Sequence, residues 1–204
     1  MSLSQKTNSI ERLSEPLLEK SNERFIQLPL KYPKLQNAYL EHQALFWNHQ
    51  EIDYAADLKD WQKLSKDEQF FTEMILAFFA GSDGIVLENI MSNFATEVTA
   101  PEVRNFYSFQ ALIENVHALT YASLLDTLVT DEDKKKKLFN SIDTIPCVKK
   151  KADWAMKWMN PETEPFEQRL VAFACVEGIF FSGSFCAIFW LKDRGLMTKA
   201  LGGS

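Results

Sequence analysis

The chain has 204 residues, 46% of them hydrophobic and 25% charged, which is the profile of a folded protein with a sizeable core. Its net charge of -6 excludes a basic nucleic-acid groove or a surface for anionic membranes as the main binding surface. The 3 cysteines, Cys147, Cys175 and Cys186, lack metal-ligand spacing, and we expect buried, reduced thiols in a cytoplasmic protein.

The N-terminal part is predicted to hold an arm, an extended stretch and one helix. Residues 1–20 are polar with little periodicity and are predicted to be a mobile arm, in which residues 15–18 can dock locally. Two prolines favour an extended stretch over 25–33, and apolar positions recur at helical spacing over 34–47. The loop after this helix carries Trp47, Asp53 and Asp57.

Two long helices are predicted in the middle of the chain. Ser65, with Glu68 three residues later, forms a capping-box pattern before a helix over 70–94 whose centre is almost entirely apolar. Pro101 fits the first position of a second helix, which is predicted to reach about Val129.

The segment after these helices is predicted to be charged and solvated. Residues 131–137 read as a solvated helix start or linker, and residues 143–146 as a turn. The lysines at 149–151 are predicted to precede a helix holding Trp154 and Trp158. A solvated basic face is favoured for these lysines over a phosphate site.

The last predicted helix, 166–192, contains an apolar run over 171–191 that approaches the length needed to span a bilayer. Glu177 lies in the middle of this run, where a carboxylate is costly in lipid, so a fully buried core helix is favoured over a membrane helix. The sequence shows no strand-like alternation of useful length, no internal repeat and no glycine-rich phosphate loop. An all-α architecture follows.

Residues 111–121 place a carboxylate, an imidazole and a phenol on one helical run. Glu114 and His117 are about one turn apart on the same face, and Tyr121 follows one turn further along. Glu-x-x-His on a helix is a ligand pair with which helical bundles hold two metals. The alternatives are a hydrogen-bonded polar pair on the helix surface and an ordinary buried tyrosine.

Each of the three long apolar helices carries an acidic residue at a position where burial is expected. These residues are Asp83, Glu114 and Glu177, and no lysine or arginine lies within about a helical turn of Asp83 or Glu177. Unpaired buried carboxylates are costly, so metal ions are the simplest source of compensating charge. Carboxylate oxygens with imidazole suit iron or manganese.

Several long runs carry a family resemblance that extends from about Glu15 to Met197. They are E-P-L-L (15–18), F-W (46–47), L-A-F-F-A-G-S-D-G-I-V-L-E-N (76–89), E-N-V-H-A-L-T-Y (114–121), I-P-C-V-K-K-K-A-D-W-A (145–155) and V-A-F-A-C-V-E-G-I-F-F-S-G-S-F (171–185). With these runs the chain resembles the small, radical-generating subunit of class I ribonucleotide reductase in its eukaryotic and viral form. The resemblance implies a ferritin-like helical bundle, here over residues 21–204.

The resemblance also implies a role for each candidate site residue. Asp83, Glu114 and His117 would bind the iron nearer the radical, with Glu114 bridging to a second iron that Glu177 also binds. Two iron ions, or manganese, would act with O2 to oxidise Tyr121 to a stable tyrosyl radical. The remaining residues are Trp47, on the electron route, and Phe181 and Phe185, in the apolar wall around the radical.

The resemblance implies partners as well, and the end of the chain departs from the family pattern. The small subunit would pair with another small subunit, as a homodimer or heterodimer, and serve a large catalytic subunit; no nucleic-acid or membrane partner is expected. The chain stops at L-G-G-S, before an expected second Glu-x-x-His helix and a docking tail. A non-catalytic dimerising partner and a ferritin-like di-iron oxidase are the alternatives.

Overall fold

The computed structural model describes residues 15–202, apart from the side chain of Glu23, and this part of the chain is helical without strands. The helices are α1 (Pro33–Gln43), α2 (Leu58–Trp61), α3 (Lys66–Asn89), α4 (Ala95–Glu97), α5 (Pro101–Leu128), α6 (Glu132–Phe139), α7 (Ser141–Thr144), α8 (Pro146–Trp158), α9 (Phe166–Cys175) and α10 (Ser182–Asp193).

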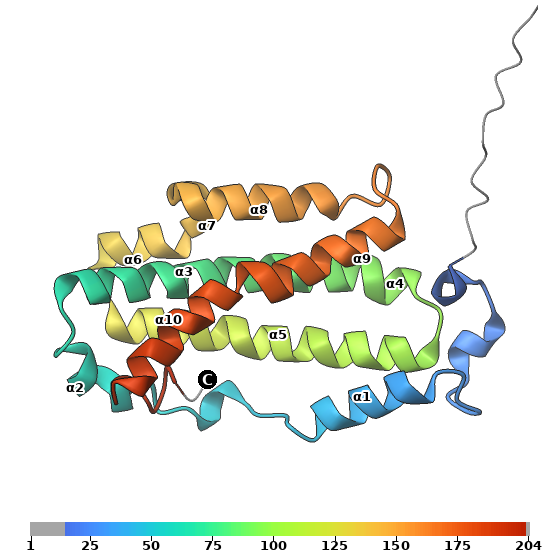
Figure 1. Ribbon diagram of the computed structural model, residues 1–204, viewed down its shortest axis with the longest axis horizontal. Helices are drawn as coiled ribbons and strands as arrows, with labels where there is room; N and C mark the ends of the chain where they lie inside the picture. Colours follow the sequence, from blue (N-terminus) through green and yellow to red (C-terminus); the bar gives the residue numbers. More distant parts are fainter. Residues whose placement is uncertain (1–14, 203–204) are drawn as a thin grey trace, which may run out of the picture.

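The long helices α3 and α5 lie side by side at the centre of the molecule (Figure 1). Helix α1 packs on α5, whereas α6, α7 and α8 pack on α3. Helices α9 and α10 form a nearly continuous, bent helical segment that crosses α3 and α5 in this view. The core between the central helices contains Leu76, Phe79, Leu124 and Leu125, none of which is more than 1% exposed. The site described below therefore rests on the best-packed elements of the fold.

Local sequence signals set the ends of the two central helices. The Ser65 hydroxyl accepts from the Glu68 amide and the Glu68 carboxylate accepts from the Ser65 amide, so the predicted capping box is confirmed. Pro101 occupies the start of α5, where its missing N–H leaves no hydrogen bond unmade. The predicted end of α5 near Val129 is confirmed to within one residue.

Two π-helical turns interrupt the predicted long helices. One, Ile90–Phe94, follows α3, and the other, Val176–Phe180, lies between α9 and α10. A π turn inserts one residue into the helical repeat and so rotates the side chains on either side of it. Glu177 lies in the second π turn, which periodicity in the sequence did not predict.

The prediction that 171–191 is fully buried is wrong. Two helical stretches, Lys66–Glu97 and Phe166–Asp193, are long and apolar enough to cross a membrane, a property that core helices of soluble proteins share. The first is 61% buried over its most apolar window, but the second is only 22% buried. One face of α9–α10 packs on α3 and α8, whereas the other has no covering element among the described residues.

Other local predictions need correction. The lysines at 149–151 lie inside α8, because Pro146 already begins that helix, and residues 143–146 are divided between α7 and α8. The three thiols are free but not buried: Cys147 and Cys186 are exposed and Cys175 is partly exposed. Helix α1 ends at Gln43, earlier than the predicted residue 47.

The predicted local docking of residues 15–18 is confirmed, because this stretch is bonded to Thr99. Residues Pro16–Leu18 form a short 3-10 turn, and the Leu17 carbonyl accepts from both the amide and the hydroxyl of Thr99, at 2.8 and 3.0 Å. The rest of the predicted arm, residues 1–14, lies outside the described residues, so the boundary at residue 20 stays a prediction.

Candidate metal centre

Asp83 is a buried carboxylate in the second half of α3 and is 3% exposed. Its Oδ2 atom receives no hydrogen bond from residues 15–202. Burial, followed by the nearby charges of Glu114 and Glu177, holds the pKa of Asp83 well above its usual range. A buried carboxyl group with a raised pKa is stabilised either by binding a proton or by a nearby cation.

Helix α5 supplies the second and third groups of the site. Glu114 is buried, and its Oε2 atom lies 3.1 Å from Nδ1 of the partly exposed His117, one turn further along the helix. Each of Asp83, Glu114 and His117 offers an atom, and these atoms lie within 4.8 Å of one another. A surface pair accounts for the contact of Glu114 with His117, but not for Asp83 beside them.

Glu177 approaches the same site from the second π turn. It lies outside the close group of three, yet burial and the charge of Glu114 raise its pKa to about 7. Gln110 Nε2 donates to Glu177 Oε1 at 3.2 Å. Gln110 is a site residue that sequence reasoning missed, and its position one turn before Glu114 on α5 was the available signal.

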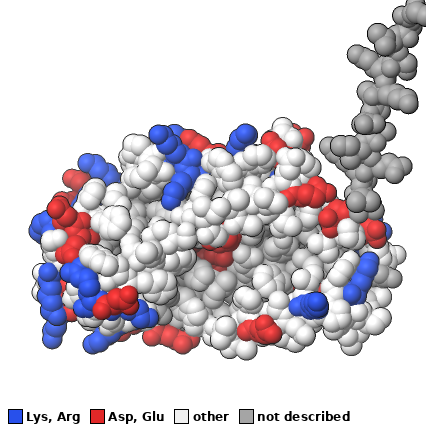
Figure 2. All heavy atoms as spheres, viewed as in Figure 1, with Lys and Arg blue, Asp and Glu red and all other residues white. Residues whose placement is uncertain are grey.

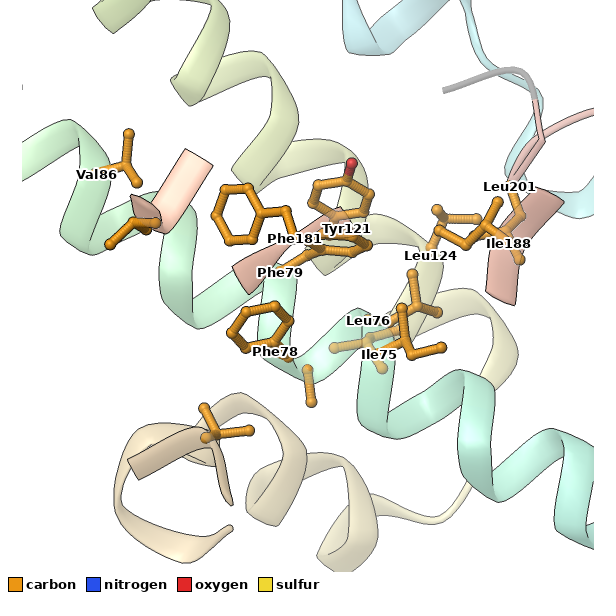
Figure 3. Packing of buried hydrophobic residues seen from close by; sticks show 14 of the residues in the cluster. Ile75, Leu76, Phe78, Phe79, Val86, Tyr121, Leu124, Phe181, Ile188 and Leu201 are labelled. Carbon is orange, nitrogen blue, oxygen red and sulfur yellow. The ribbon is translucent and has the colours of Figure 1, made fainter. Parts of the chain in front are cut away.

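Tyr121 is enclosed by aromatic rings next to these carboxylates. It is 6% exposed and stacks on Phe79 with ring centroids 4.8 Å apart (Figure 3). Burial, with smaller contributions from the charges of Asp83 and Glu114, holds its pKa well above the usual range. The phenol is therefore neutral at physiological pH and within electrostatic reach of the candidate ligands.

The other predicted aromatic residues lie at different depths around the site. Phe181 is 5% exposed and packs edge-on against Phe79 at 5.5 Å, whereas Phe185 is 38% exposed and 4.9 Å from Phe79. Trp47 is partly buried in the loop after α1, with its ring 5.9 Å from that of His117. The His117 ring thus lies near both Trp47 and Tyr121, with its centroid 6.4 Å from that of Tyr121.

The residues present fit a metal ion. The site combines three carboxylates with one imidazole, and this donor set suits iron or manganese. Within the described part of the chain, no group donates a hydrogen bond to Asp83 Oδ2. On the face in Figure 2, acidic atoms lie in a hollow near the centre, surrounded by a mostly uncharged surface.

A comparison with known families decides the relationship. The sequence profile described as "Ribonucleotide reductase, small chain" matches residues 24–201. The chain belongs to this family. A ribonucleoside-diphosphate reductase small chain from Neurospora crassa is 53% identical over 92% of this chain and 46% of its own length. The small chain from Variola virus is 52% identical over 90% of this chain and 57% of its own length.

The solved structures of ribonucleotide reductase small chains confirm the predicted ferritin-like, all-α fold. The ribonucleotide reductase Rnr4 homodimer from Saccharomyces cerevisiae superposes with a TM-score of 0.80 at 36% identity, covering 91% of this chain and 58% of that chain. The predicted resemblance to eukaryotic and viral small subunits is also confirmed. The chain spans about half the length of the curated relatives it matches.

Proposed function

We propose that this chain acts as a small subunit of ribonucleoside-diphosphate reductase, in which Tyr121, beside a metal centre, would be oxidised to a radical. A large catalytic subunit would use this radical to convert ribonucleotides to deoxyribonucleotides. The observation that carries the proposal is the unpartnered Asp83 carboxylate beside Glu114, His117 and a buried tyrosine. Membership of the small-chain family supports the same reaction.

The chain offers ligands for two ions. Asp83, Glu114 and His117 would hold one ion, and Glu177 would help to hold a second. Two iron ions suit these donors, and manganese is the alternative. With O2, the bound metals would supply the one-electron oxidation of the phenol.

The protein residues control the phenol. Its raised pKa keeps the proton on Tyr121 Oη, so oxidation must transfer that proton to an acceptor. The charges that act on this phenol are those of Asp83 and Glu114. Phe79 and Phe181 exclude water from the ring, which favours a long-lived radical. Phe185 contributes to this wall from a more exposed position.

Trp47 is proposed to connect the centre to the large subunit. Its ring lies 5.9 Å from that of His117, and Trp47 also lines a surface depression of about 500 Å³. An electron leaving or entering the site through Trp47 needs no contact between Tyr121 and solvent. We place the working complex in the cytoplasm, as a dimer of small subunits bound to the large subunit.

A second candidate is a non-catalytic partner that dimerises with a complete small subunit. The exposed outer face of α9–α10 favours it, because this apolar surface needs a covering protein. The related Rnr4 protein was solved as a homodimer. A ferritin-like di-iron oxidase is less favoured, because the arrangement of Trp47, His117 and Tyr121 is suited to moving an electron.

Metal-dependent stability tests the proposal. We expect Mn²⁺ or anaerobic Fe²⁺ to stabilise the chain by about 3 kcal/mol at a hundredfold excess over the dissociation constant. The Asp83→Asn variant should be more stable than the wild type without metal, by about 1–2 kcal/mol, because it removes a buried unpartnered carboxyl. The same variant should lose most of the stabilisation by metal.

The matched control for this test is Glu88→Gln, an exposed carboxylate on the same helix. It should respond to metal as the wild type does. A wild-type chain that gains no stability with either metal, and binds a full-length small subunit instead, would reject the first candidate in favour of the second.

A further inference from the structure

The three lysines of α8 do not have the same environment. Lys149 pairs with Asp153 on the surface at 2.9 Å, and Lys150 is exposed. Lys151 instead turns towards the core, with its Nζ atom 4.0 Å from the centroid of the Phe78 ring. The expectation of a solvated basic face therefore holds for two lysines and is wrong for Lys151.

Lys151 makes its hydrogen bond to the π turn that carries Glu177. Its Nζ atom donates to the carbonyl of Phe180, the last residue of that turn, at 3.2 Å. The neighbouring carbonyl of Ile179 accepts from the Ser182 hydroxyl at 2.9 Å. Regular helical bonding is seen again at Phe181, whose carbonyl accepts from the Phe185 amide at 3.0 Å.

Side chains thus donate hydrogen bonds to the backbone carbonyls of Ile179 and Phe180, where the π turn meets α10. A π turn is less favourable than an α-helix of the same sequence, so it persists where other contacts stabilise it. Lys151 donates from another helix to a backbone carbonyl of the turn, whereas Gln110 on α5 donates to the Glu177 side chain. Trp154, one turn further along α8, adds a ring contact with Phe180 at 5.0 Å.

The same ammonium group links the π turn to the helix of Asp83. Phe78 is on α3, five residues before Asp83, and also contacts Phe181 at 5.5 Å. In Figure 3, Phe78 and Tyr121 lie on opposite sides of Phe79. Lys151 therefore contacts both α3, which carries Asp83, and the π turn, which carries Glu177.

We propose that Lys151 is a positioning residue for the metal centre, which holds the Val176–Phe180 π turn and thereby keeps Glu177 directed at Asp83 and Glu114. The proposal rests on the proposed function for the role of Glu177, but its effect on the π turn is independent of metal. Burial lowers the pKa of Lys151, in keeping with an ammonium that lies against rings rather than in bulk water.

Hydrogen exchange of the metal-free chain tests the structural part. Lys151→Met should raise amide exchange over residues 176–185 by about tenfold relative to the wild type, because one anchoring hydrogen bond is lost. Exchange in α5 should stay unchanged. Lys150→Met, its exposed neighbour, should exchange as the wild type does, and Lys151→Arg should restore protection because its guanidinium can still donate.

Metal binding tests the positioning part. Lys151→Met should lower the number of Mn²⁺ ions bound per chain to the number bound by Glu177→Gln, while Lys151→Arg keeps the wild-type number. If the wild-type chain binds no metal, the proposed function fails, while the exchange experiment still decides the role of Lys151 in the π turn.

Two results would overturn the inference. One is wild-type exchange over 176–185 in Lys151→Met. The other is a loss of protection throughout the chain that Lys151→Arg does not reverse, because that would make Lys151 a general core residue.

Discussion

At the scale of single residues, the site is defined by carboxyl groups held where water cannot stabilise their charge. Among the described residues, no donor reaches Asp83 Oδ2, and Glu177 accepts from the side-chain amide of Gln110. Both groups have raised pKa values, and burial is the largest cause in each case. The protein therefore keeps unfavourable charge at one position, which a bound cation would relieve.

This arrangement predicts an unusual pH dependence for the metal-free chain. Glu177 has a pKa of about 7 in the fold against an ordinary value of 4.5, so the folded state holds a proton that the unfolded state releases. Its contribution is fully present below about pH 4.5 and is lost as pH rises through about 7, a decrease of about 2–3 kcal/mol in the free energy of unfolding. Asp83 acts in the same direction.

Urea denaturation between pH 4.5 and 8 in the presence of a chelator measures this effect. Glu177→Gln should flatten the profile, whereas Glu167→Gln, an exposed carboxylate on α9, should leave it unchanged. A wild-type chain whose stability rises through this window would contradict the raised pKa of Glu177.

Residue-level predictions from the sequence succeeded where the signal was local. The spacing of Glu114, His117 and Tyr121 on one helix places them on one face wherever that helix lies. Asp83 was found because a lone acid in an apolar run needs an explanation. Gln110 lies one turn before Glu114, and this spacing was a usable signal that the sequence reasoning did not apply. Lys151 was missed because nothing in its sequence neighbourhood distinguishes an inward lysine from a solvated one.

At the scale of elements, the C-terminal segment is held by a buried carboxylate far away in sequence. Asp57 is fully buried, and it accepts hydrogen bonds from the amides of Lys199, Ala200 and Leu201 at 2.8–3.1 Å. Asp60 accepts from the Met197 amide at 3.3 Å. The two acids act on this segment as a helix cap does, by pairing consecutive free amides.

Removal of this anchor should release the segment. We expect Asp57→Ala to lower the free energy of unfolding by about 2–4 kcal/mol, because three amides lose a charged, buried acceptor. Limited proteolysis should then cleave within residues 196–202. Asp53→Ala, which removes an exposed cap bonded to the Ala55 amide, should cost about 1 kcal/mol and leave the segment protected. Equal resistance of both variants would show that Asp57 does not anchor the segment.

The ends of helices were predicted correctly where residues at the end itself determine them. The capping box at Ser65 and the proline at 101 set the starts of α3 and α5. The π turns and the bond from Asp57 to residue 200 depend on contacts between distant helices. No pattern within a short window of sequence encodes such contacts.

At the scale of the whole molecule, the outer face of α9–α10 is the main departure from expectation. Val171, Ile179 and Phe189 are 64%, 66% and 57% exposed on the most apolar stretch of the chain. The sequence indicates correctly that residues 171–191 are apolar enough to form a buried helix face. It does not show that this face is left uncovered by the described elements.

This face predicts association in solution. We expect the chain to form dimers or larger species at micromolar concentrations, because large exposed apolar patches are usually protein interfaces. Light scattering after size exclusion should show a shift towards monomer when Val171 and Ile179 are both replaced by glutamate. Phe139→Glu, at the end of α6, should associate as the wild type does. A wild-type monomer at all concentrations would contradict this account of the face.

The most direct test of the metal centre beside Tyr121 is to load the chain with Fe²⁺ without air, admit O2, and record iron content and the electron paramagnetic resonance spectrum. We predict retained iron and an organic radical signal that disappears in Tyr121→Phe but persists in Tyr107→Phe, a buried tyrosine that stacks on Phe94 instead. A chain that retains no iron, or a signal that survives in Tyr121→Phe, would contradict the account.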